Sequence, residues 1–314
     1  MIPRPRDTPR AAASARRATM GGDAPTPQGC RDIPSGRRPV RGPVAFLVRP
    51  VPGPGEHGVR GPDLRRRGRL PPRARPRQRR HPAPGLGSAD AGVAVASQET
   101  PHPPATPEFG AVTPGGASHV YPASDGLAVT KFSVGPYDNN VYVLSAGDEA
   151  LIVDGANDAA RILAEVRGRR VRAIVQTHGH FDHVQALERL VAELGVDVYA
   201  HSGDARKMPV ATTDLGEGDG LTVGGVPVRV MHTPGHTPGS LCFVAGSFLF
   251  SGDTLFPGGP GGTDGDAKRF AQVMTSLGRL FALPDGTRVC PGHGLDTFIG
   301  RERPHVETWR ARGW

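Results

Sequence analysis

Short apolar runs alternate with polar turns along the last two thirds of the chain. Continuous or alternating apolar runs are typical of strands, whereas apolar residues three or four positions apart are typical of helices. The pattern predicts a mixed α/β domain. The predicted strands lie at residues 127–134, 141–146, 150–153, 171–175, 196–200, 226–231, 241–244 and 248–250, and the predicted helices lie at residues 158–166, 182–194, 267–281 and 303–312.

Residues 1–120 lack such a pattern and differ in composition. They contain 20 Arg, no Lys and 8 acidic residues, a net charge of +12, and since the whole chain carries +8, residues 121–314 carry −4. The segment is rich in Pro and Gly and cannot bury enough apolar surface to offset its chain entropy. We therefore predict a disordered tail at residues 1–120 and one folded domain at residues 121–314.

The Arg-rich tail has two further interpretations. Arginines can bind nucleic acid or an acidic membrane surface through phosphate groups, but no aromatic residue lies within residues 65–80 to stack on a base. Abundant Arg, Ala, Pro and Gly is also typical of translated GC-rich DNA upstream of a true start. We favour this overextended reading frame as a hypothesis, and we do not expect nucleic-acid binding.

Targeting signals and cysteine chemistry are weak in this sequence. No apolar run approaches the length of a membrane-spanning helix, and no apolar stretch follows the pair Arg16 and Arg17 as a signal peptide would require. The three cysteines, Cys30, Cys242 and Cys290, are odd in number and widely spaced, which does not indicate a disulfide framework. We expect a cytoplasmic protein without a membrane partner, and its oligomeric state stays open.

Three imidazoles and a carboxylate are concentrated directly after the predicted strand at residues 171–175. Side chains alternate in an extended segment, so His178, His180 and Asp182 point one way while His183 points the other. Such a segment can face two metal ions. Imidazole nitrogen and carboxylate oxygen suit zinc, and iron or manganese are also possible. A histidine-rich turn without metal is the simpler interpretation, but further potential ligands follow.

Each further potential ligand comes where a predicted strand ends, and such positions often carry catalytic groups. His236 lies in a turn stiffened by prolines and glycines, Asp253 ends an apolar run, and His293 ends another. These residues are enough to give each of two ions three ligands, with Asp253 able to bridge the ions. Each ion would keep an open coordination position, which is typical of catalytic metal sites. The two sets are His178, His180 and His236 for one ion, and Asp182, His183 and His293 for the other.

These motifs resemble the metallo-β-lactamase-fold hydrolases, in particular the glyoxalase II-like (hydroxyacylglutathione hydrolase-like) branch. Residues 139–155 are similar to the opening strands of that family and residues 292–302 to its closing segment, so the likeness covers about residues 127–312. The resemblance implies an αββα sandwich. It also implies that Asp154 and Thr177 support the ligand loop, and that His236 is the ligand while His232 makes a supporting hydrogen bond.

The resemblance further implies a dinuclear hydrolase of small thioesters, with zinc favoured. Two divalent ions about 3.5–4 Å apart can share a hydroxide that attacks the acyl carbon. Asp182 would orient this nucleophile or handle its proton. Two departures leave the thiol carrier open. Residues 184–186 lack the glycine usual after the motif, and the chain ends soon after His293, without the family's helical glutathione-binding domain.

Other functions fit parts of this pattern. An iron persulfide dioxygenase would use a single iron held by His178, His236 and Asp253, and a lactonase would need the same two-metal attack as a thioesterase. A β-lactamase is less expected, because the commonest zinc enzymes use a cysteine near the place of Asp253. A non-enzymatic scaffold would predict missing ligands, and none is missing.

Overall fold

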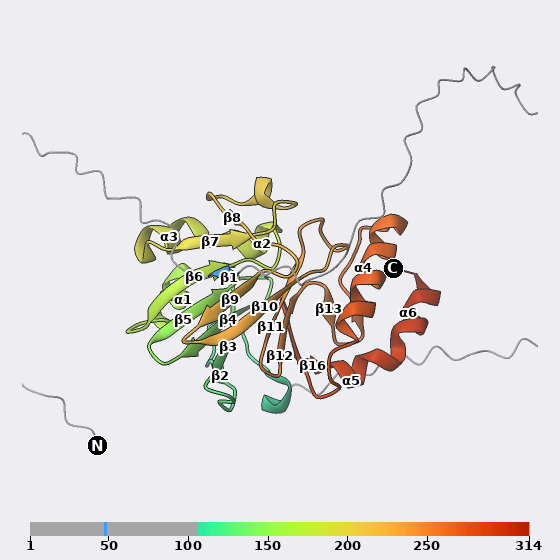
Figure 1. Ribbon diagram of the computed structural model, residues 1–314, viewed down its shortest axis with the longest axis horizontal. Coiled ribbons are helices and arrows are strands. Elements are labelled where there is room, and N and C mark those ends of the chain that lie inside the picture. The colour runs from blue at the N-terminus through green and yellow to red at the C-terminus, as the bar shows by residue number, and fades with distance from the viewer. Residues whose placement is uncertain (1–46, 49–105, 314) are drawn as a thin grey trace, which may run out of the picture. The chain divides into compact units, whose positions relative to one another are not determined.

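The structure is a computed structural model that describes residues 47–48 and 106–313 (Figure 1). Most of the predicted tail therefore lies outside the described residues. Its last part belongs to the fold, because β2 (His119–Val120) pairs with β3 (Ala128–Val134) and Phe109 of η1 (Pro107–Phe109) is buried. The folded domain thus begins before the predicted boundary at residue 121.

The strands of the described residues form two large sheets and a small hairpin. The first sheet has the order β2-β3-β4-β5-β6-β7-β8 and the second the order β1-β9-β10-β11-β12-β15-β16. The remaining strands of the first sheet are β4 (Asn139–Ala146), β5 (Glu149–Val153), β6 (Arg170–Val175), β7 (Asp197–Ala200) and β8 (Thr213–Asp214). The second sheet contains β1 (Leu47–Val48), β9 (Gly220–Val223), β10 (Val226–His232), β11 (Leu241–Ala245), β12 (Phe248–Gly252), β15 (Arg288–Pro291) and β16 (Thr297–Phe298), and the hairpin consists of β13 (Leu255–Phe256) and β14 (Gly259–Pro260).

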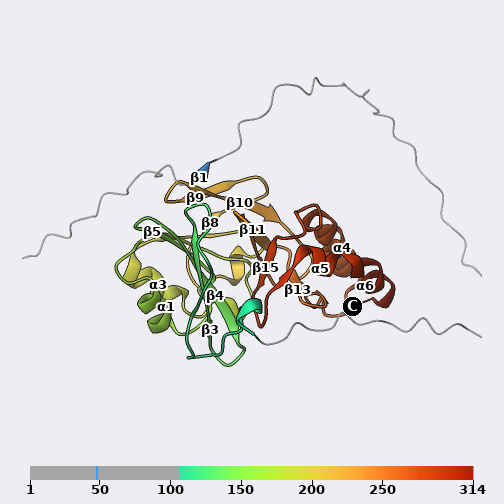
Figure 2. The same cartoon turned by 90° about the horizontal axis from the view of Figure 1, so that it is seen from below.

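Three hydrophobic clusters show how the layers pack. Side chains from both sheets, among them Leu144, Val153, Val230 and Phe243, form the central cluster. A second cluster joins the outer face of the first sheet to helices α1 (Ala159–Glu165) and α3 (Leu187–Leu194). A third joins the second sheet to α4 (Ala267–Leu280) and α6 (Val306–Arg312), on the opposite side of the molecule (Figures 1 and 2). The predicted αββα sandwich is confirmed.

The predicted helices agree with the structure except where tertiary contacts intervene. Helix α4 starts at the capping residue Asp266, whose carboxylate accepts two backbone N–H groups, and ends one residue before its predicted end. The predicted helix at 182–194 is wrong as one unit. It forms α2 (Phe181–Val184) and α3, because the N–H of Ala186 turns to the carbonyls of Gly155 and Ala156. The last predicted helix is likewise divided into η3 (Arg303–His305) and α6, after α5 (Ile299–Glu302).

Parallel pairing brings several polar loops to one edge of the sandwich. Strands β5, β6 and β7 are parallel, so the segments that follow them, including Asp154, Thr177 and the 3-10 helix η2 (Ala205–Lys207), emerge on the same side. Strands β12 and β15 are also parallel, which places Asp253 and His293 together. The sheets therefore direct the predicted ligands to one place. None of the described helices is long and apolar enough to cross a membrane.

Candidate metal centre

All seven predicted ligands meet at this edge of the sandwich. The first set is His178, His180 and His236, and the second set is Asp182, His183 and His293; the potential ligand atoms within each set lie within 4.8 Å of one another. In the first set, Nδ1 of His180 is 3.1 Å from Nε2 of His178 and 2.9 Å from Nε2 of His236. In the second set, Nε2 of His293 is 3.1 Å from Nε2 of His183 and 3.3 Å from Oδ2 of Asp182.

Asp253 lies between the two sets. Its Oδ2 atom is 3.5 Å from Nε2 of His236 and 3.9 Å from Nε2 of His178. Its Oδ1 atom is 3.5 Å from Nε2 of His183, and Oδ2 is also 3.6 Å from Nε2 of His293. One carboxylate thus faces ring nitrogens of both sets, which is the position that a bridging ligand requires.

The hydrogen bonds on the far side of the rings show that a cation fits here. Nδ1 of His236 donates to the carbonyl of Gly262, and Nδ1 of His293 donates to the carbonyl of Tyr137. A neutral imidazole that donates through one nitrogen presents a lone pair at the other. These rings therefore direct lone pairs at their neighbours, an arrangement that a metal ion stabilises. The buried Oδ1 atom of Asp253 also lacks a hydrogen-bond partner among the described residues.

Asp154 supports one histidine of each set. Its carboxylate accepts the backbone N–H of Thr177 at 2.7 Å, the hydroxyl of Thr177 at 2.8 Å and Nδ1–H of His183 at 2.9 Å. Because the Thr177 hydroxyl donates to Asp154, its oxygen accepts from Nδ1 of His178, 3.0 Å away. The predicted supporting positions of Asp154 and Thr177 agree with these contacts. The sequence could not show that one carboxylate serves both sets.

The second set carries a strong internal electrostatic field. Burial by itself lowers the pKa of His183, but the carboxylates of Asp253, Asp154 and Asp182 raise this pKa to about 9. Burial opposes ionisation of Asp182, yet the contact with His293 and the charge of His183 hold the pKa of Asp182 well below its usual value. In the first set, burial lowers the pKa of His178 and of His180, so these rings stay neutral and able to bind metal.

Further supports of the second set were missed at the sequence level. Nδ2 of Asn139 donates to Oδ2 of Asp182 at 2.9 Å. Beneath His293, the fully buried ammonium of Lys131 donates to Oδ1 of Asp296 at 2.8 Å and to the carbonyl of Gly294 at 2.7 Å. Asn139 lies in the segment that carried the family resemblance. The contacts of Lys131 could not be predicted from local sequence, because Gly294 and Asp296 are more than 160 positions away from it.

Another missed carboxylate supports the first set. Oδ2 of Asp204, a buried residue, accepts the N–H of Gly179 at 3.0 Å and the hydroxyl of Thr237 at 2.5 Å. It thereby joins the segment that carries His178 and His180 to the turn that carries His236. Asp204 comes shortly after β7, just as the predicted ligands come after their strands. This position is the sequence feature that could have indicated a role for Asp204.

His232 makes its hydrogen bond to the backbone near the first set. Its Nε2 atom lies 2.9 Å from the carbonyl of Pro238, and its ring stacks on His201 with centroids 3.9 Å apart. It belongs to no donor set among the described residues. His232 therefore contacts the backbone of the loop that carries His236. The hydrogen bond of His232 thus goes to this loop rather than to a ligand side chain.

The layered fold and the paired donor sets define an α/β sandwich with a candidate two-metal site. The family model described as Metallo-beta-lactamase superfamily matches residues 134–293, and the chain belongs to this superfamily. Over 159 residues it is 40% identical to a protein named hydroxyacylglutathione hydrolase from Anaeromyxobacter dehalogenans (strain 2CP-C), covering 50% of this chain but only 61% of that relative.

Two solved structures show the same fold. One is the BLEG-1 B3 metallo-beta-lactamase, with 31% identity, a TM-score of 0.51, and coverage of 57% of this chain and 97% of that one. The other is ETHE1 from Myxococcus xanthus, with 29% identity, a TM-score of 0.50, and coverage of 56% and 81%. The predicted superfamily is therefore confirmed, and its fold, together with the donor sets, implies divalent metal binding.

Proposed function

We propose that this protein is a dinuclear metal-dependent hydrolase of thioesters. The observation that carries the proposal is the position of Asp253 between two complete sets of three donors. A site for a single ion would leave the other set as a cluster of converging ligand atoms without a charge to stabilise it. Two bound divalent ions would supply a hydroxide nucleophile at neutral pH and polarise the acyl carbonyl.

The residues of the site differ in burial. The rings of His178 and His183 are buried at the base of the site, whereas the side chains of Asp182 and His293 are 23% and 25% exposed. A substrate therefore approaches from the side of Asp182. This carboxylate is held ionised and is fixed by Asn139, so we assign it the orientation of the nucleophile rather than storage of a proton.

Thioester hydrolysis needs no protein nucleophile in this scheme, and the described cysteines agree with that. Cys242 and Cys290 are buried and form no disulfide. Burial raises the pKa of Cys242 to about 11, so its thiol stays protonated and unreactive. The similarity to the protein named hydroxyacylglutathione hydrolase supports a thioester substrate. Zinc is the metal that we propose.

A second candidate function uses a single iron. Oδ2 of Asp253 lies 3.5 Å from Nε2 of His236 and 3.9 Å from Nε2 of His178, which are the two histidines and one carboxylate of a mononuclear persulfide dioxygenase site. The second donor set would then have no role in catalysis. The completeness of that set is the reason why we place the hydrolase first.

Metal analysis combined with two assays tests both candidates. The full-length chain is purified without added metal, its metal content is measured by plasma mass spectrometry, and it is assayed on S-lactoylglutathione. About two zinc ions per chain with thioester cleavage support the hydrolase. About one iron per chain, no cleavage, and oxygen uptake with a persulfide would overturn the hydrolase and support the dioxygenase.

A further inference from the structure

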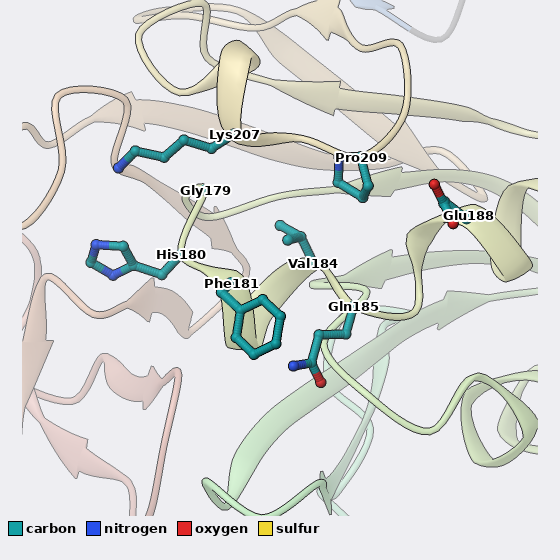
Figure 3. A pocket seen from close by; sticks show the side chains of 8 residues that line it. All are labelled: Gly179, His180, Phe181, Val184, Gln185, Glu188, Lys207 and Pro209. Atoms are coloured by element: carbon teal, nitrogen blue, oxygen red, sulfur yellow. The ribbon is translucent and has the colours of Figure 1, made fainter.

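A pocket of about 510 Å³ opens beside the first donor set. His180 borders it at one end and Glu188 at the other, between the segment of α2 and the loop that follows η2 (Figure 3). The walls are mainly apolar and are formed by Phe181, Val184 and Pro209. A pocket that starts at a ligand of the metal centre is well placed to receive the part of a substrate next to the reacting carbonyl.

One aromatic side chain in this pocket is unusually accessible. Phe181 stands between the ligands His180 and Asp182, and its side chain is 70% exposed, more than the other large apolar side chains of the described residues. Its ring contributes little to the core and adds apolar surface to the mouth of the pocket (Figure 3). Such a ring is available to pack against an apolar part of a ligand.

Lys207 is the only cation that lines the pocket. Its side chain runs along the wall, so that the ammonium group lies at the same end as His180 (Figure 3). Oδ1 of Asp204 is 3.8 Å from Nζ, too far for a hydrogen bond, and the side chain of Lys207 is 45% exposed. Nζ is thus in a loose ion pair with Asp204 but makes no hydrogen bond within the described residues, so it can still donate to a ligand.

The backbone fixes the position of Lys207 next to the metal ligands. Gly179, which lies between His178 and His180, donates its N–H to Oδ2 of Asp204 at 3.0 Å. A Cβ atom on Gly179 would stand 3.0 Å from Cβ of Lys207 and 3.1 Å from Cβ of Asp204. This glycine therefore allows the loop to pack directly against the ligand segment.

We propose that this pocket binds the arm of the thioester substrate that extends from the reacting carbonyl, and that Lys207 pairs with a carboxylate on that arm. The apolar walls would hold the carbon chain of the arm. Glu188 at the far end disfavours a second negative group there, so the carboxylate belongs near the metal centre. The inference rests on the proposed thioesterase function and assigns Lys207 the role of a specificity-determining residue.

The carboxylate can belong to the acyl group or to the thiol, and two matched pairs of substrates separate these sources. S-succinyl-N-acetylcysteamine and S-butyryl-N-acetylcysteamine differ by a carboxylate on the acyl group. S-acetylglutathione carries two carboxylates and an ammonium group on its thiol, whereas the thiol of S-acetyl-N-acetylcysteamine is uncharged. For each pair, the preference is the ratio of kcat/KM for the charged substrate to that for the neutral one.

The full-length zinc-loaded protein is compared with three variants. Lys207→Gln is expected to reduce the preference in one of the pairs about tenfold, mainly through KM, because a hydrogen bond between charged groups is lost. Lys207→Arg should retain most of the preference. The control is Lys268→Gln, since Lys268 is exposed on α4 and does not line the pocket. The pair that responds identifies the arm that carries the carboxylate.

Three results would overturn the inference. An unchanged preference in both pairs, with thioesters still cleaved by the unaltered protein, would refute the role of Lys207 and leave the hydrolase intact. Loss of zinc from Lys207→Gln, measured by plasma mass spectrometry, would show that the residue acts on the metal centre rather than on the substrate. If the unaltered protein cleaves none of the four thioesters, the proposed function and this inference both fail.

Discussion

The two donor sets use similar ligands but are held in different ways. Each ligand of the second set has a polar support, since Asn139 holds Asp182, Asp154 holds His183, and the carbonyl of Tyr137 holds His293. In the first set, Nε2 of His180 makes no hydrogen bond within residues 106–313, and its ring lines the pocket. The second set is therefore held by hydrogen bonds at all three ligands, whereas the first set is held in this way at His178 and His236 but not at Nε2 of His180.

Removing one ligand from each set should produce the largest effects and test this difference. Asp182→Ala and His180→Ala are each expected to lose about one ion and to lower kcat by about 100-fold or more. The ion that remains in His180→Ala should resist a chelator longer, because the supported second set holds it. Metal content is followed during dialysis against a chelator. Faster metal loss from His180→Ala than from Asp182→Ala, or an unaltered kcat for Asp182→Ala, would contradict the comparison.

Lys131→Met should destabilise the fold, because Lys131 is buried beneath the second set. The Lys131 and Asp296 side chains are fully buried. Without Lys131, the carboxylate of Asp296 keeps only Arg288 and the hydroxyl of Tyr121 as partners, which costs about 3 kcal/mol of unfolding free energy. Chemical denaturation of the metal-free protein measures this change. Lys268→Met, at an exposed site on α4, is the control and should change stability by less than about 0.5 kcal/mol. Equal stability of the two variants would show that the buried pair has no structural role.

Asp154→Asn should weaken both sets together. Asp154 adopts a positive φ of 65°, which asparagine tolerates, so the backbone is preserved while the charge is lost. Because the carboxylate supports His183 directly and His178 through Thr177, the zinc affinity of each set is expected to fall about 10- to 100-fold. Competition with a coloured chelator measures both affinities. A loss confined to one set would refute the shared role.

Asn139→Ala should have the smallest effect and act on the second set alone. Its amide makes one hydrogen bond to Asp182, at 2.9 Å. Removing it should lower the zinc affinity of the second set about tenfold and leave that of the first set unchanged. The same chelator competition provides the measurement, with the first set as the internal control. An equal fall in both affinities would indicate a general disturbance of the fold.

The metal donors and most of the helices and strands could be predicted from the local sequence. Contacts between residues far apart in sequence account for several differences from these predictions. Helix α4 has a capping Asp266 and a clear apolar face, so its limits could be predicted within one residue. The helix predicted at 182–194 divides, since Ala186 donates to Gly155 and Ala156. No local sequence pattern indicates these hydrogen bonds. The same holds for Asp204, whose link between two ligand loops is a tertiary contact.

By itself, the sequence determined which residues can bind metal and that each follows a strand, because residue type and strand periodicity are local properties. Only the tertiary structure decided how they are grouped and supported. Parallel pairing brings Asp154, Thr177 and Asp204 to one edge and places Asp253 between the two sets. It also places Lys207 beside His180, where Gly179 allows the backbones to meet. Such contacts depend on how sheets and loops pack, which short-range patterns do not encode.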